Sequence, residues 1–173
     1  MIPKDNKLYK EQLKNIAENI IEEFDKNNKN SDYEFLDFMK IALWVHKNIK
    51  YDLNYAGRRD LTAIDIYKMR VGVCYHYTIL CNALLYSLGY KVIFIYRFCC
   101  KKISDGYTDS GGGHAWSLIK INNKWYPFDS TWGIISGKLP ATHIFGRFFF
   151  LHEIITRYRV VSSAFESQFK YNS

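Results

Sequence analysis

The sequence lacks several features that would point to a common class of protein. It has no apolar run long enough to cross a bilayer, so we expect no membrane partner. Its first residues contain no apolar segment of the kind that a secretory leader needs. Four cysteines, none in a C-x-x-C pair, are too few for a disulfide framework. We therefore expect a reduced, cytoplasmic setting, with a domain of a larger exported protein as the alternative.

Positive charge is in excess but is not concentrated. The chain has 24 Lys and Arg against 17 Asp and Glu, a net charge of +7. The first thirty residues carry six charges of each sign, and the excess is spread over the rest. There is no basic helix interleaved with aromatic residues and no zinc-finger spacing, so we expect a solvated basic surface and no nucleic-acid partner. An acidic calcium-binding loop is also lacking, and we expect no metal and no other cofactor.

The composition favours one packed domain over residues 1–173, because 48% of the residues are apolar and 17% are aromatic. Helical periodicity, a capping-box pattern at Ser31 and Glu34, a cap at Thr62 and a terminating Gly89 mark four helices. The expected helices cover residues 5–26, 31–49, 62–69 and 74–88.

Apolar and alternating runs predict strands in the second half of the chain. The polar segment 101–113 ends in three glycines and is expected to be a mobile loop hinged at residues 111–113. Residues 51–60 are also expected to form a loop. The expected strands cover residues 92–96, 114–121, 124–129, 148–150 and 158–161.

Cys74 is expected at the first turn of its helix, directly after Gly72 and Val73. Unpaired backbone N–H groups and the helix dipole favour a thiolate there, and a nearby imidazolium would lower the thiol pKa further. A buried, inert cysteine is the alternative reading for Cys74, and it is our expectation for Cys81. His76 is expected to point elsewhere, as a polar surface or core residue.

The hairpin predicts a contact between a histidine and an aspartate. If Asn122 and Asn123 form its turn, Trp116 lies opposite Asp129, and His114 points to the same face as Trp116. His114 and Asp129 are then diagonal neighbours about 7 Å apart along the backbone, close enough for the carboxylate to orient the imidazole. The alternatives are a structural histidine and an aspartate that only caps the following turn.

Three motifs in this order carry a resemblance to a known family. They are G-V-C at 72–74, G-H-A-W at 113–116 and D-S-T-W-G at 129–133. Together with W-V-H-K-N-I-K-Y-D at 44–52 and L-G-Y at 88–90, they resemble the transglutaminase-like superfamily over about residues 40–150. The resemblance implies an α+β, papain-like core, in which N-terminal helices and the helix bearing the nucleophile pack on an antiparallel β-sheet. Residues 1–30 would add an N-terminal helix to this core.

The resemblance also implies a catalytic triad of Cys74, His114 and Asp129. In such a site the thiolate attacks an amide carbonyl, a thioester forms, and water or an amine takes the acyl group. Because the chain is short, we expect a peptidase or amidase acting on a protein or peptide rather than a cross-linking enzyme. The backbone N–H of Cys74 would be one oxyanion donor, and Tyr51, Asn54 and Tyr67 are candidates for the second. Trp116 and Trp132 are expected to pack beside the triad.

Two other classes of function stay open at this point. The chain could keep the fold as a binding or scaffold module without activity. It could also hold a metal ion, although the spacing of its cysteines and histidines fits no familiar zinc pattern. The residues available for such a metal site are Cys74, His76, Cys99, Cys100 and His114.

Overall fold

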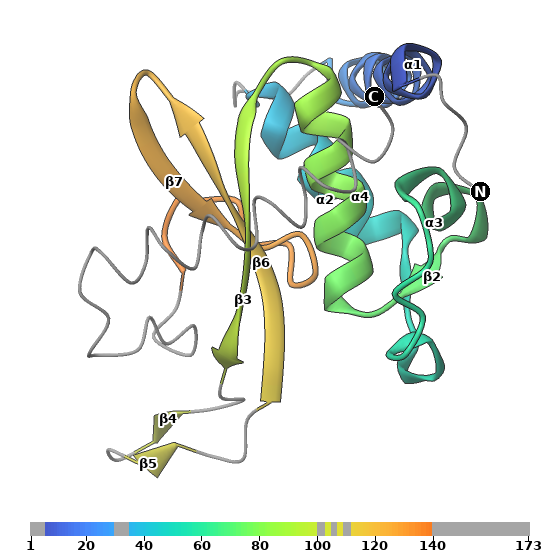
Figure 1. The fold of residues 1–173 in the computed structure, drawn as a ribbon. Coiled ribbons are helices and arrows are strands. Elements are labelled where there is room, and N and C mark those ends of the chain that lie inside the picture. Colours follow the sequence, from blue (N-terminus) through green and yellow to red (C-terminus); the bar gives the residue numbers. More distant parts are fainter. Residues whose placement is uncertain (1–5, 30–34, 100–102, 105–106, 109–111, 140–173) are drawn as a thin grey trace.

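The computed structural model describes residues 6–29, 35–99, 103–104, 107–108 and 112–139. The helix α4 (Cys74–Ser87) lies at the centre and contacts the other three helices and the sheet (Figure 1). This is the α+β arrangement that the sequence predicts. The remaining helices are α1 (Asn6–Asn27), α2 (Asp37–Asn48) and α3 (Ala63–Met69).

The main sheet is antiparallel, with strand order β3-β6-β7. Its strands are β3 (Lys91–Cys99), β6 (Gly112–Ile121) and β7 (Lys124–Phe128). Both β3 and β6 pack on α4. The helix begins at the end of the molecule where β6 also begins (Figure 1), so Cys74 and the residues around His114 share that end.

Two short strand pairs complete the described part of the fold. The parallel pair of β1 (Lys50–Tyr51) and β2 (Val71–Gly72) leads into α4, and the 3₁₀ helix η1 (Leu53–Tyr55) follows β1. The expected loop at 51–60 therefore carries some regular structure. The antiparallel pair of β4 (Ile103–Ser104) and β5 (Tyr107–Thr108) lies between β3 and β6 in the chain.

Local capping chemistry confirms two of the predicted helix ends. Thr62 and Asp65 form a reciprocal capping box at the start of α3, with Thr62 N donating to the Asp65 carboxylate over 2.9 Å. At the end of α4, Gly89 has φ +93°, a conformation that glycine adopts without strain.

The second helix starts later than its sequence pattern predicts. Ser31 and Glu34 lie outside the described residues, but Phe35 and Leu36 are not helical, and α2 begins at Asp37 behind an extended Leu36. The Phe35 ring packs edge-on against Phe24 of α1, with 5.2 Å between centroids. Phe35 thus packs on α1, and Leu36 after it is extended, at positions where the capping-box pattern predicts a helix.

The prediction of a loop over residues 101–113 is wrong for Gly112 and Gly113. Gly112 and Gly113 belong to β6 and pair with Cys99 and Phe98, because β3 runs three residues beyond the expected end at Tyr96. A hinge at these two glycines is therefore not supported. Gly111 and most of the segment before it lie outside the described residues, as do the expected strands at 148–150 and 158–161.

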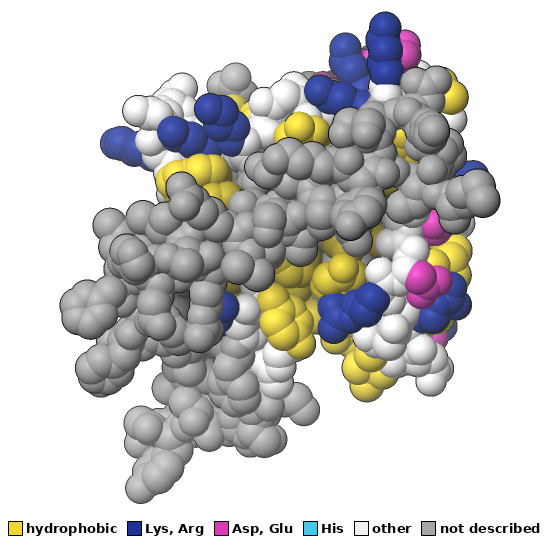
Figure 2. Space-filling view, viewed as in Figure 1, with side chains coloured by type: hydrophobic (Ala, Val, Ile, Leu, Met, Phe, Trp, Pro, Cys, Tyr) yellow, Lys and Arg dark blue, Asp and Glu magenta, His cyan; other side chains and the backbone are white. Residues whose placement is uncertain are grey.

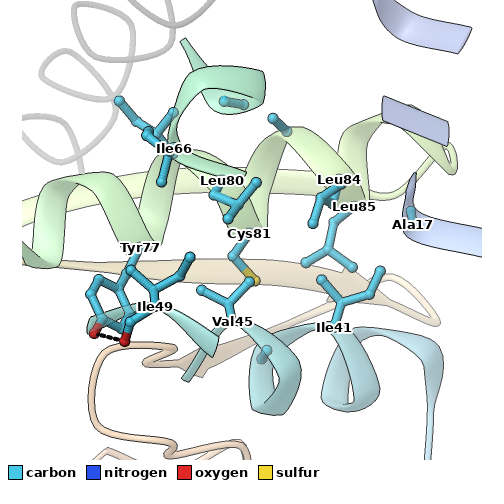
Figure 3. Packing of buried hydrophobic residues seen from close by; sticks show 14 of the residues in the cluster. Ala17, Ile41, Val45, Ile49, Ile66, Tyr77, Leu80, Cys81, Leu84 and Leu85 are labelled. Carbon is cyan, nitrogen blue, oxygen red and sulfur yellow. Dashed lines mark hydrogen bonds between the residues drawn. The ribbon is translucent and has the colours of Figure 1, made fainter. Parts of the chain in front are cut away.

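The core is built around α4, whose apolar residues meet the other helices (Figure 3). Leu80, Cys81, Leu84 and Leu85 have no exposed surface. The Tyr77 hydroxyl donates a hydrogen bond to the Ile49 carbonyl, which ties α4 to the end of α2. Across the other face, the Ser117 hydroxyl of β6 donates to Asn82 over 2.7 Å. These buried bonds hold α4 in place against α2 and β6.

Among the described residues, no helix is both long and apolar enough to cross a membrane.

Candidate active site

Cys74 is the first residue of α4, as predicted. Val73 before it is extended, with φ −108° and ψ 179°, so the chain turns from β2 directly into the helix. Cys74 is only 6% exposed and lies where the backbone N–H groups of a first helical turn have no intrahelical partner. The position therefore combines burial with donors that favour a thiolate.

His76 stabilises this turn from inside the protein. Its Nδ1 accepts a hydrogen bond from the backbone N–H of Val73 over 3.1 Å, and its Nε2 lies 2.7 Å from the Arg58 carbonyl oxygen. These two partners fix a neutral ring protonated on Nε2. Burial lowers the pKa of His76 and agrees with that form. His76 is thus a buried polar residue with both ring nitrogens engaged.

Gly72 lies against the His76 side chain. A Cβ at position 72 would come within 2.5 Å of the Cβ of His76, which is too close for any other residue to fit unchanged. The glycine is required here for a close approach of the backbone to the His76 side chain.

His114 contacts both of the other predicted site residues. Its Nε2 lies 2.6 Å from Oδ2 of Asp129, and the interaction of His114 with Cys74 lowers the pKa of the thiol. Because Asp129 occupies Nε2, Nδ1 is the ring nitrogen left for the thiol. The structure therefore brings Cys74, His114 and Asp129 together in one cluster.

The pKa shifts within this cluster have opposite signs. Burial raises the pKa of the Cys74 thiol, but hydrogen bonds with His114 and the Ala115 backbone outweigh it, and the net pKa is lowered. Burial lowers the pKa of His114, whereas Asp129 and Cys74 raise it to about 9. Both shifts favour the thiolate–imidazolium form over the thiol–imidazole form.

The hairpin register that predicts the His114–Asp129 contact is confirmed. Asn122 and Asn123 both have positive φ and form the turn, and β6 pairs with β7 as expected up to Ser117 and Phe128. The ladder ends one pair before Trp116 and Asp129, because Asp129 instead forms a bridge with Ile134.

Asp129 both closes a turn and contacts the histidine, so the two readings of this residue do not exclude each other. Its Oδ1 accepts from the backbone N–H groups of Thr131 and Trp132, at 2.8 and 3.3 Å. Its backbone exchanges two hydrogen bonds with Ile134. The side chain is fully buried, and this turn holds it at a fixed orientation toward His114.

His46, at the end of α2, supports the same turn and is not among the predicted site residues. Its Nδ1 lies 3.0 Å from the Thr131 carbonyl oxygen, which accepts the hydrogen bond. A Cβ at Gly133, which has φ +68°, would come within 2.9 Å of the His46 ring. His46 and Thr131 are 85 positions apart in the sequence, so no local pattern signals this contact.

Two tryptophans cover the His114 ring, as expected. Trp132 stacks on it with 4.6 Å between centroids and an interplanar angle of 18°, and Trp116 lies at 5.9 Å. Trp116 is fully buried, whereas Trp132 is 43% exposed. The rings shield the imidazole, which is only 6% exposed although β6 begins at exposed glycines.

Tyr51 is the one candidate oxyanion donor that the structure brings to Cys74. Its position opposite Gly72 in the β1–β2 pair puts it beside the start of α4. Burial and then the charge of Cys74 raise the pKa of Tyr51, so the two side chains lie within electrostatic reach of each other. Asn54 is exposed and its backbone N–H is bonded to Asp52, while Tyr67 stacks on Trp44.

The described residues contain no group of three or more His, Cys, Asp and Glu that could hold a metal ion. His76 cannot serve as a ligand while both of its ring nitrogens are engaged. Cys100 lies outside the described residues, and nothing in the described part of the chain builds the metal site that was kept as an alternative.

Comparison with known proteins identifies a family. The model of the transglutaminase-like superfamily matches residues 14–130. No curated protein matches the chain significantly. A solved structure of a candidate cysteine protease from Cytophaga hutchinsonii is similar over 68% of this chain and 38% of its own, with 19% identity and a TM-score of 0.49. A solved TGase is similar over 78% of this chain and 35% of its own, with 13% identity and a TM-score of 0.47.

The present chain thus spans little more than a third of the length of these two solved chains. The family match covers well over half of the present chain and includes Cys74, His114 and Asp129. The chain belongs to the transglutaminase-like superfamily.

Proposed function

We propose that this protein is a cysteine-dependent enzyme that cleaves an amide through Cys74, His114 and Asp129. The observation that carries the proposal is the cluster itself. A thiol at a helix start has its pKa lowered by an imidazole whose Nε2 lies 2.6 Å from a buried carboxylate. This is the arrangement that nucleophile, acid–base and orienting groups need.

In the first half of the reaction, the Cys74 thiolate attacks the carbonyl carbon of the amide. The C=O electron pair moves to oxygen, and the backbone N–H of Cys74 and the Tyr51 hydroxyl donate hydrogen bonds to this oxyanion. The His114 imidazolium then gives its proton to the amide nitrogen as the C–N bond breaks. The amine leaves, and the acyl group stays on sulfur as a thioester.

In the second half, neutral His114 takes a proton from water while the water oxygen attacks the thioester. The C–S bond breaks, the thiolate returns, and His114 is again an imidazolium. Asp129 keeps the ring in position through both halves. We favour hydrolysis over transfer to an amine. Tyr51 and Trp132, which flank the cluster, are 49% and 43% exposed, so the cluster lies beside the protein surface although Cys74 and His114 are each only 6% exposed.

The test is to trap an acyl-enzyme on Cys74 from a peptide library and to identify the attached group by mass spectrometry. We expect an adduct on Cys74 in the wild type, none in Cys74→Ala, and much slower formation in His114→Ala. If water is the acceptor, the released acyl product should have the mass of the free acid even when a primary amine is added.

The alternative is a binding or scaffold module that has kept the fold without the chemistry. It predicts no adduct from any peptide, and a Cys74 thiol whose rate of reaction with iodoacetamide follows an ordinary thiol titration with or without His114. That result would reject the enzymatic proposal.

A further inference from the structure

Three exposed aromatic side chains lie beside Cys74, His114 or the strand that carries His114. Tyr51, Tyr96 and Trp132 are 49%, 43% and 43% exposed, although each contacts the cluster or the strand that carries it. On the face in Figure 2, hydrophobic side chains gather near the start of α4, next to positively charged side chains. Substrate approaching the sulfur therefore meets aromatic rings and positive charge.

Tyr96 lies against the glycine before His114. A Cβ at position 113 would lie 2.0 Å from the Tyr96 hydroxyl oxygen, so the phenol rests directly on the Gly113 backbone. Tyr96 also contributes to the raised pKa of Tyr51, so the two phenols lie within electrostatic reach of each other. Gly113 thus has a structural role different from the hinge expected of it.

The Arg59 guanidinium lies over two aromatic rings, those of Tyr75 and Tyr96. Its guanidinium carbon lies 4.2 Å from the centroid of the Tyr75 ring and 5.9 Å from that of Tyr96. Tyr75 follows Cys74 in the chain, and its ring packs edge-on against Phe94 of β3. Stacking on aromatic faces restricts the guanidinium, and a restricted guanidinium loses less freedom on binding an anion.

Within the described part of the chain, Arg59 has no acidic partner. Asp60 is taken by Arg58, whose guanidinium makes two hydrogen bonds of 2.9 Å to it. Asp65 is bonded to Thr62, and Asp52 accepts from the backbone of Asn54. The two adjacent arginines therefore differ. The charge of Arg58 is balanced by the Asp60 carboxylate, whereas that of Arg59, beside Tyr75, is not balanced by a described carboxylate.

We propose that Arg59, stacked on Tyr75 and Tyr96, binds a carboxylate of the substrate near the scissile amide, so that the preferred substrate is an acidic peptide. Guanidinium groups bind carboxylates through paired N–H···O bonds. The proposal rests on the proposed function for the position of the scissile bond at Cys74. Its test does not depend on turnover.

The experiment compares two thiol reagents that differ only in charge, maleimidopropionic acid and maleimidopropionamide. Rates of modification at Cys74 are measured by peptide mass spectrometry for the wild type, Arg59→Gln and Arg58→Gln. Arg58 is the matched control, because both side chains are exposed and each substitution removes one positive charge. Circular dichroism spectra of the three proteins verify that they are folded.

We expect the ratio of the acid rate to the amide rate to fall by about two- to fivefold in Arg59→Gln and to stay nearly constant in Arg58→Gln. Added salt should reduce the wild-type ratio. An unchanged ratio in Arg59→Gln, or an equal fall in Arg58→Gln, would overturn the proposal. Failure of the proposed function gives a different result, which a fourth protein, His114→Ala, reveals: both reagents then react slowly with the wild type, and the substitution leaves both rates unchanged.

Discussion

Cys74 and Cys81 lie about two turns apart on α4, and both are buried, at 6% and 0% exposed. Their thiols nevertheless differ in opposite directions from an ordinary cysteine. Burial raises the pKa of Cys81, which is surrounded by core residues and lies near Ser130 and Asp129. At Cys74, hydrogen bonds with His114 and backbone groups outweigh burial and lower the pKa. Burial alone therefore does not decide reactivity, and the first turn and the interior of one helix have separate roles.

The largest expected effect comes from a substitution that removes the difference in reactivity between Cys74 and Cys81. His114→Ala removes the partner that lowers the Cys74 pKa, so alkylation of Cys74 by iodoacetamide at pH 7 should slow by about tenfold or more. Cys81 should stay unlabelled in both native proteins. Labelling of the two cysteines at equal rates in the wild type would contradict the comparison.

The second prediction addresses the interior. Leu84→Ala should lower the free energy of unfolding by about 2–5 kcal/mol, because Leu84 has no exposed surface and its loss leaves a cavity. Urea unfolding measures this change. The alkylation rate of Cys74 in the folded variant should stay near that of the wild type. A large fall in that rate would mean that the interior and the first turn are not separable.

A third prediction concerns the glycine that precedes the first turn. Gly72→Ala places a methyl group within 2.5 Å of His76 and should displace the start of α4, with a loss of about 1–3 kcal/mol in stability and slower alkylation of Cys74. Gly57→Ala is the control, since a Cβ there meets nothing within 4 Å. If both substitutions behave alike, the contact with His76 does not matter.

The smallest expected effect is a change of stability with pH. The folded pKa of His114 is about 9, above its ordinary 6.5, so the folded state holds more protons and stability falls as pH rises between these values. The lowered pKa of Cys74 acts in the opposite direction, because the unfolded thiol keeps its proton until about pH 9. The two contributions partly cancel in the wild type.

Removing the thiol separates the two contributions. In Cys74→Ala, where Asp129 still raises the pKa of His114, stability should fall by about 1 kcal/mol as pH rises from 6.5 toward 9. Cys74→Ala combined with His114→Gln should not show this decrease. Urea unfolding at several pH values compares the two variants, and parallel curves would disprove the assigned shift.

The parts of the fold that were predicted correctly depend on neighbours in the chain. The Thr62 cap, the Gly89 end of α4 and the turn at Asn122 and Asn123 each follow from the chemistry of a few adjacent residues. Because the turn fixes the register, the contact between His114 and Asp129 could also be predicted. The turn at Asn122 and Asn123 thus predicts both the face on which His114 lies and its contact with Asp129.

The parts that were missed depend on contacts between distant segments. No local pattern indicates that His46 binds the Thr131 carbonyl, or that Arg59 lies over Tyr96. The late start of α2 comes with packing of Phe35 on α1, and sequence rules favoured an earlier cap. Which of three candidates approaches Cys74 could be decided only by the pairing of β1 with β2, which selects Tyr51.

The cluster joins chain segments forty residues apart, and this gives the protein an internal reporter of its native state. Once α4 and β6 separate, the sulfur at position 74 loses its imidazole and should react like any thiol in a random chain, while the one at position 81 becomes accessible. The labelling ratio of two peptides from one digest would then report the folded fraction in a crude extract, without purification or a substrate.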